Sequence, residues 1–165
     1  MRNQDLERFN GLPREEAEGA LLACFANHEW SARMAAGRPY RDVDQVLAAA
    51  EQAWTGLKPG DWLRAFAAHP RIGERGGHAP ASSDREQAAV TQASAATRAA
   101  LAAENREYEE RFGHVFLISA SGRGADEILH ALRQRMKNDP FRELEVAAAE
   151  QRKITRLRLL ALLNA

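Results

Sequence analysis

The residues from His69 to Glu74 place an imidazole at a point where the sequence disfavours a continuing helix. Pro70 disfavours helical backbone at the residue before it, and Gly73 lets the chain turn further. An imidazole has an unperturbed pKa of about 6.5, which suits proton transfer near neutral pH. His69 is therefore a candidate general acid, and a capping or solvated histidine is the structural alternative.

A second polar group has the spacing of a helix start. Ser83 and Glu86 are arranged as in a capping box, where each side chain accepts from the backbone N–H of the other. Gln87 points about 100° further round the helix, so Glu86 and Gln87 can present a carboxylate and an amide to one ligand. Capping explains Ser83 and Glu86 without a ligand, and the ligand-binding alternative requires this helix start to face His69.

Arg158 is a charged residue on the apolar side of the last predicted helix. At about 100° per residue, the other residues on this side are Leu144, Ala147, Gln151, Ile154 and Ala161. Arg152 and Arg156 project to the outer side, where solvated charges are expected. A guanidinium among apolar residues pairs with a carboxylate or binds an anion, and both alternatives stay open for Arg158.

A glycine-containing loop runs from Ser119 to Gly124 after the short strand-like run that begins at Phe116. Its two glycines allow backbone N–H groups to converge on a ligand before the next helix. No Walker or dinucleotide-binding pattern accompanies the loop, so an ordinary glycine turn is the alternative.

The elements that must position these residues are helices. Alanine is frequent, β-branched residues are few, and apolar residues recur at three- and four-residue spacing, which together predict an all-α fold. The expected helices cover residues 2–10, 13–27, 28–36, 42–55, 59–68, 84–112, 124–137 and 140–163. The length suits one core, so we expect a single-domain bundle of about eight helices over residues 1–165.

Composition argues against several classes of function. The 23 basic and 23 acidic residues cancel without a basic patch, which argues against nucleic-acid binding. The histidines lack the spacing of paired metal ligands, and Cys24 lies among apolar neighbours as a buried thiol, so we expect neither a metal nor a covalent nucleophile. Trp30, Trp54 and Trp62 are expected as core or interface aromatics. The absence of a signal peptide or a long apolar run predicts a cytoplasmic protein without a membrane partner.

The run His69-Pro70-Arg71-Ile72-Gly73-Glu74, followed by Ser83-Asp84-Arg85-Glu86-Gln87, resembles the 2-oxo-4-hydroxy-4-carboxy-5-ureidoimidazoline (OHCU) decarboxylases of the urate-to-allantoin pathway. Further segments agree with that family in the same order. They are Asn27, Trp30, Met34 and Arg38-Pro39-Tyr40, then Asn105, Tyr108, Phe112-Gly113 and Phe116-Leu117-Ile118, then Arg135-Met136-Lys137-Asn138, and finally Lys153-Ile154 and Leu157-Arg158-Leu159. The resemblance covers nearly the whole chain.

The resemblance implies a cofactor-free decarboxylase that converts a small ureidoimidazoline to S-allantoin, usually as a homodimer. By resemblance to the stand-alone bacterial form, the catalytic residues are His69 and Glu86. The implied substrate-binding residues are Pro70, Ser83, Glu86, Gln87, Ile118, Ser119, Ala120, Ser121, Gly122 and Arg158. In this interpretation His69 delivers one proton to one face of the decarboxylated ring. The rival from another class is a non-catalytic helical ligand-binding or adaptor module, in which Glu86 only caps a helix and Arg158 closes an ion pair.

Overall fold

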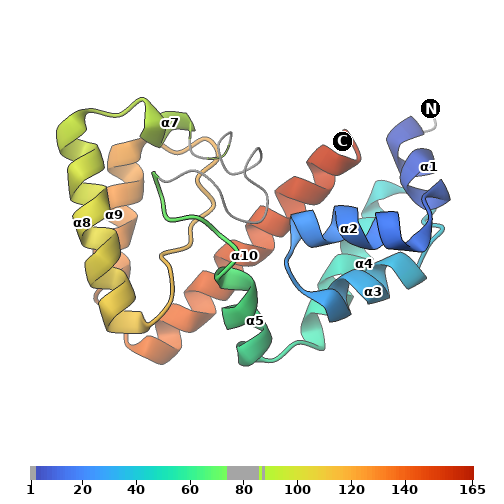
Figure 1. Cartoon of the computed structure of the whole chain (residues 1–165), viewed down its shortest axis with the longest axis horizontal. Coiled ribbons are helices and arrows are strands. Elements are labelled where there is room, and N and C mark those ends of the chain that lie inside the picture. Colours follow the sequence, from blue (N-terminus) through green and yellow to red (C-terminus); the bar gives the residue numbers. More distant parts are fainter. Residues whose placement is uncertain (1–2, 74–85, 87) are drawn as a thin grey trace. The chain divides into compact units, whose positions relative to one another are not determined.

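The computed structural model describes residues 3–73, 86 and 88–165 (Figure 1). Across these residues the backbone forms helices joined by turns and irregular segments, without a strand, so the predicted all-α class is confirmed. The chain divides into two compact units. Unit 1 comprises Met1–Ala65 with Ile154–Ala165, and unit 2 comprises Phe66–Lys153. In the described part of the chain, no helix is long and apolar enough to cross a membrane.

The helices of unit 1 begin at side chains that cap them. These helices are α1 (Gln4–Gly11), α2 (Arg14–Cys24), α3 (His28–Ala36) and α4 (Val43–Thr55), with most of α5 (Pro59–Phe66). Asn3, Asn27 and Asp42 precede α1, α3 and α4, and each accepts a hydrogen bond from the backbone N–H three residues later. Because such a cap satisfies a helical N–H that has no intrahelical partner, these three starts follow from local sequence.

Aromatic side chains form much of the core of unit 1. Trp30 packs edge-on against Phe25 with ring centroids 5.4 Å apart, and its indole N–H donates to the Ala50 carbonyl at 3.2 Å. Trp54 stacks on Trp62 with centroids 5.7 Å apart. Trp30 and Trp54 are buried and Trp62 is half-buried, which confirms the expected core role of these tryptophans.

Unit 2 contains α7 (Ala88–Thr91), α8 (Ala95–Phe112), α9 (Ala125–Arg135) and the first part of α10 (Pro140–Leu162). The prediction of one helix over 84–112 was wrong, because α7 ends at Thr91 and α8 starts after Ser94. The Ser94 hydroxyl accepts from the Thr97 N–H at 3.2 Å, so this serine starts a new helix within the apolar pattern.

One apolar cluster joins the separate segments of unit 2. Its buried members are Ile72, Val90, Leu101, Tyr108, Phe116, Ile118, Ala120, Ile128, Leu129 and Leu132. The cluster therefore contains a residue of the 69–73 turn, a residue of α7 and two residues of the irregular segment at 118–122. Two regions that the sequence singled out for chemistry, the turn at 69–73 and the segment at 118–122, therefore share one core.

Candidate active site

His69 lies just beyond the end of α5, where its backbone N–H still donates to the Phe66 carbonyl at 3.0 Å. Its imidazole is half-buried, and Nε2 lies 2.6 Å from Oε1 of Gln151 on α10. An amide oxygen only accepts hydrogen bonds, so with the Gln151 amide in this orientation the hydrogen of the bond belongs to Nε2 of His69. Gln151 is completely buried, which gives the histidine a fixed partner inside the protein.

The turn after His69 is anchored on both sides. The Arg71 guanidinium binds the Glu109 carboxylate of α8, with Nε–Oε1 and Nη2–Oε2 distances of 2.7 and 3.1 Å. Ile72 is buried in the unit 2 core, and Gly73 has a φ of +92°, a conformation that side chains other than glycine rarely adopt. These contacts hold the backbone that carries His69.

The proposed binding segment 118–122 is irregular but largely buried. Ile118, Ser119 and Ala120 have small exposed fractions, whereas Ser121 and Gly122 are exposed. The Arg123 N–H donates to the Ala120 carbonyl at 3.0 Å, and the turn between them needs the positive φ of 76° that Gly122 adopts. The segment therefore enters from the core and turns at the surface before α9.

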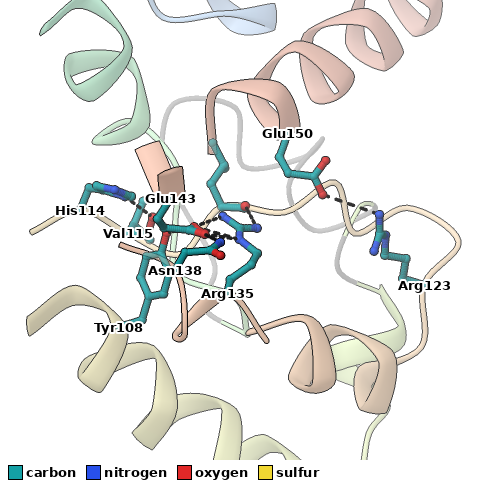
Figure 2. A network of polar contacts seen from close by, with 9 residues as sticks. Tyr108, His114, Val115, Arg123, Arg135, Asn138, Glu143 and Glu150 are labelled. Carbon is teal, nitrogen blue, oxygen red and sulfur yellow. Dashed lines mark hydrogen bonds and ion pairs between the residues drawn. The ribbon is translucent and has the colours of Figure 1, made fainter. Parts of the chain in front are cut away.

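A buried ion pair holds the start of this segment (Figure 2). The Arg135 guanidinium donates through Nε to Glu143 Oε1 and Oε2 at 3.0 and 2.9 Å, and through Nη1 to the Leu117 carbonyl at 2.6 Å. Tyr108 donates its hydroxyl to Glu143 Oε2 at 2.6 Å, and burial raises the pKa of Tyr108, so it remains a donor. The guanidinium also lies 4.6 Å from the Phe116 ring centroid. The backbone entering residues 118–122 is thereby fixed by a charge-assisted hydrogen bond.

A second ionic contact lies at the far end of the segment, as Figure 2 also shows. Nη2 of Arg123 is 3.6 Å from Oε1 of Glu150 on α10, and Oε2 of Glu150 is 2.7 Å from Nζ of Lys153. Glu150 is buried, with 6% of its surface exposed, and a buried charge needs compensation. Arg123 and Lys153 supply it from two sides. Both ends of the 118–122 segment are thus connected to charged side chains.

The predicted residues of the second polar group are only partly visible. Glu86 has helical backbone and a half-buried side chain. Ser83 and Gln87 lie outside the described residues, so the predicted capping box and the ligand-binding amide stay predictions. In the parts that the structure describes, no three His, Cys, Asp or Glu residues form a group that could hold a metal ion.

Arg158 belongs to unit 1 and is buried, with 8% of its surface exposed, as its place on the apolar side of the last helix predicted. Arg152 and Arg156 are exposed, also as predicted. Arg158 lies close enough to Cys24 to favour the thiolate, but burial is the larger effect and raises the Cys24 pKa to about 12. Cys24 is therefore a buried thiol, as expected, and is protonated near neutral pH.

The structure brings together, in unit 2, most of the residues that the sequence singled out. His69 and Pro70 lie in the anchored turn, and residues 118–122 lie in a segment that shares its core with that turn. The sequence pattern placed Gln151 on the apolar side of the last helix and did not indicate its contact with His69. A polar amide among apolar residues was the available sign, because a buried amide needs a hydrogen-bond partner.

Comparisons with known proteins indicate the same family for this chain. The model of the OHCU decarboxylase family matches residues 10–160. The chain is 35% identical over 159 residues to the uric acid degradation bifunctional protein TTL of Arabidopsis thaliana, a match that covers 93% of this chain and 49% of the plant protein. The chain thus spans about half the length of this plant relative. It is 27% identical over 161 residues to the 2-oxo-4-hydroxy-4-carboxy-5-ureidoimidazoline decarboxylase of Haloferax volcanii, which covers 96% of each chain.

A solved structure agrees with these relatives. The crystal structure of an OHCU decarboxylase in the presence of (S)-allantoin superposes with a TM-score of 0.79 and 36% identity, over 89% of this chain and 99% of the other. The family model covers most of the sequence, and this structure shares both fold and sequence with the chain. The chain therefore belongs to the OHCU decarboxylase family.

Proposed function

We propose that this protein decarboxylates 2-oxo-4-hydroxy-4-carboxy-5-ureidoimidazoline to S-allantoin in urate catabolism. Membership in the OHCU decarboxylase family over residues 10–160 is the observation that carries the proposal. The fixed imidazole of His69 supports it, because the reaction needs a proton donor at a defined position. We further propose that residues 1–165 act as one decarboxylase domain.

The substrate itself can stabilise the electron pair that decarboxylation leaves behind, so the proposed reaction needs no cofactor. When the bond from the ring carbon to the carboxylate breaks, carbon dioxide leaves and the electron pair is delocalised over the conjugated nitrogen and carbonyl groups of the substrate. The electron pair passes into the neighbouring C=N bond, whose nitrogen takes up a proton. A second proton then adds to the neighbouring ring carbon, which carries the ureido group, and the carbon that lost the carboxylate becomes a carbonyl by releasing its hydroxyl proton. The protein has to hold the ring, surround the departing carboxylate with few water molecules, and deliver the proton to one face. One-sided delivery makes a single enantiomer of the product.

The residues of this chain divide these tasks in the proposed mechanism. His69 donates the proton from the turn that Pro70 begins. Glu86 binds an N–H or hydroxyl group of the substrate and, where it approaches His69, favours the imidazolium. The groups that hold the ureido, ring amide and oxygen-rich parts of the substrate are Ser83, Gln87, Arg158 and the backbone of Ile118, Ser119, Ala120, Ser121 and Gly122. The two anchored ends of that segment support its role, since a binding loop must keep its shape.

The family resemblance also supports a proposal for the oligomeric state, the location and the cofactor requirement of the enzyme. We propose a homodimer in the cytoplasm of a bacterium, acting on a small-molecule substrate and requiring no metal or organic cofactor. The balanced charge of 23 basic and 23 acidic residues supports the absence of nucleic-acid and membrane partners.

Circular dichroism of the product tests this function. Urate oxidase and hydroxyisourate hydrolase generate the substrate in the cuvette, and the signal of allantoin is followed with and without the protein. Rapid formation of one enantiomer is the expected result, and heat-denatured protein is the control. Slow formation of racemic allantoin in the presence of a folded sample would instead favour the non-catalytic helical binding module.

A further inference from the structure

We propose that Gln151 is a positioning residue that keeps a hydrogen on Nε2 of His69, so that His69 exchanges its catalytic proton through Nδ1. The inference rests on the proposed role of His69 as the proton donor. It adds a residue for which neither the sequence pattern nor the comparisons provide a role. It also specifies which of the two imidazole nitrogens does the chemistry.

The contact itself has a defined polarity. Nε2 of His69 and Oε1 of Gln151 are 2.6 Å apart, and Gln151 is completely buried. With Oε1 of Gln151 toward the ring, a neutral imidazole that carried its hydrogen on Nδ1 would place a lone pair on Nε2 against a lone pair on Oε1. In a buried setting that loss of a hydrogen bond is costly, so the geometry favours hydrogen on Nε2. The other nitrogen, Nδ1, then accepts a proton in the neutral form and donates it in the imidazolium form.

The hydrogen bond between His69 and Gln151 can persist in both protonation states of His69. Imidazolium and the neutral Nε2–H tautomer both donate from Nε2, so Gln151 need not move when His69 gains or loses the proton on Nδ1. This arrangement fixes the direction in which the catalytic proton leaves the ring. Delivery of that proton to a single face of the substrate requires such a fixed direction.

The choice of an amide over a carboxylate also has a consequence. A carboxylate at this distance would favour the imidazolium strongly, whereas a neutral amide accepts the same hydrogen bond without adding a negative charge. Other charged groups occur on the elements next to His69. Arg71 pairs with Glu109, and Glu150 pairs with Arg123 and Lys153. The third group is Glu86, which the proposed function places at the substrate. His114, whose ring lies 5.6 Å from that of Phe66, is the titratable neighbour on the 113–124 side.

Nuclear magnetic resonance of the imidazole nitrogens tests the tautomer without any need for activity. Protein labelled with ¹⁵N-histidine is studied above the His69 pKa, and the His69 signals are identified by their loss in His69→Asn. The expected spectrum shows a protonated Nε2 and an unprotonated Nδ1, and Gln151→Met, similar in size, should lose this strong preference. A protonated Nδ1 in the unsubstituted protein, or an unchanged preference in folded Gln151→Met, would overturn the proposal.

The pH dependence of turnover tests the function of the contact. Gln151→Glu should move the His69 limb of the pH profile upward by about 1 to 3 pH units, because an opposite charge this close favours the imidazolium. Gln134→Glu, an exposed position on α9, makes the same change of charge and should leave the profile unchanged. An unshifted profile in Gln151→Glu would contradict the proposal. If the unsubstituted protein does not catalyse the proposed decarboxylation, the proposed function is wrong. The NMR result would decide the tautomer of His69 in that case too.

Discussion

The helix starts of unit 1 and the irregular segment of unit 2 are held by polar groups in different ways. In unit 1, Asn3, Asn27 and Asp42 each bind a backbone N–H three residues later, around a core rich in aromatic side chains. In unit 2, Arg135 and Glu143 form a buried ion pair, and Arg135 binds a carbonyl 18 residues before it in the chain. Short-range hydrogen bonds start regular helices, whereas the irregular segment is held by a residue far from it in sequence.

The difference follows from the backbone hydrogen bonds that each segment cannot form by itself. A helix satisfies most of its own backbone groups, so only its ends need side-chain partners. The segment from His114 to Gly124 has no ladder of its own, and a buried carbonyl such as that of Leu117 needs a donor from elsewhere. Unit 2 supplies that donor as a charge, and the charge in turn needs Glu143. An irregular buried segment such as residues 118–122 therefore depends on long-range polar contacts for its shape.

The largest expected effect comes from separating the buried pair. Glu143→Leu should reduce the free energy of unfolding by about 3 to 5 kcal/mol, because the Arg135 guanidinium would stay buried without its carboxylate. Denaturant unfolding followed by circular dichroism measures the change. A loss below about 1 kcal/mol, the size of an exposed pair, would contradict the buried role of this contact.

The double variant Arg135→Met/Glu143→Leu is the matched control. Because both charges are removed, much of the lost stability should return. The double variant also removes the Arg135 donor of the Leu117 carbonyl, so KM should be raised even where stability recovers. Recovered stability together with the KM of the unsubstituted protein would show that Arg135 does not shape the 118–122 segment.

A smaller effect is expected at the helix starts. Asn27→Ala should reduce the free energy of unfolding by about 1 kcal/mol, because Asn27 is buried and accepts the Trp30 N–H at 2.8 Å. Ser94→Ala, at the exposed cap of α8 in unit 2, should cost about 0.5 kcal/mol, the lower end of the range. Thermal or denaturant unfolding compares them, and a larger loss for Ser94→Ala would reverse the expected order.

Much of the helical fold could be predicted because the relevant signals are local. The ranges 28–36, 42–55 and 140–163 agree with α3, α4 and α10 to within a residue. The break at 92–94 was missed because alanine-rich sequence on both sides supports helix, and only Ser94 marks the new start. A serine cap is hard to distinguish from a tolerated serine inside a helix when no glycine or proline accompanies it.

The candidate site could be predicted where the backbone itself is unusual. Pro70 and Gly73 marked the turn beside His69, and Arg158 was identifiable as a charge on an apolar helix side. The partners of these residues come from distant parts of the sequence, so spacing did not indicate that Gln151 meets His69 or that Arg135 meets Leu117. Only burial and hydrogen-bond geometry reveal such pairs.

Substitution of His69 tests whether this residue donates the proton. His69→Ala and the exposed control His130→Ala are compared in the coupled assay, with product handedness and initial rate measured together and folding checked by thermal unfolding. Folded His69→Ala is expected to give only the slow, racemic background, while His130→Ala forms S-allantoin at the unsubstituted rate. Rapid formation of S-allantoin by His69→Ala would contradict the assignment of His69 as the proton donor.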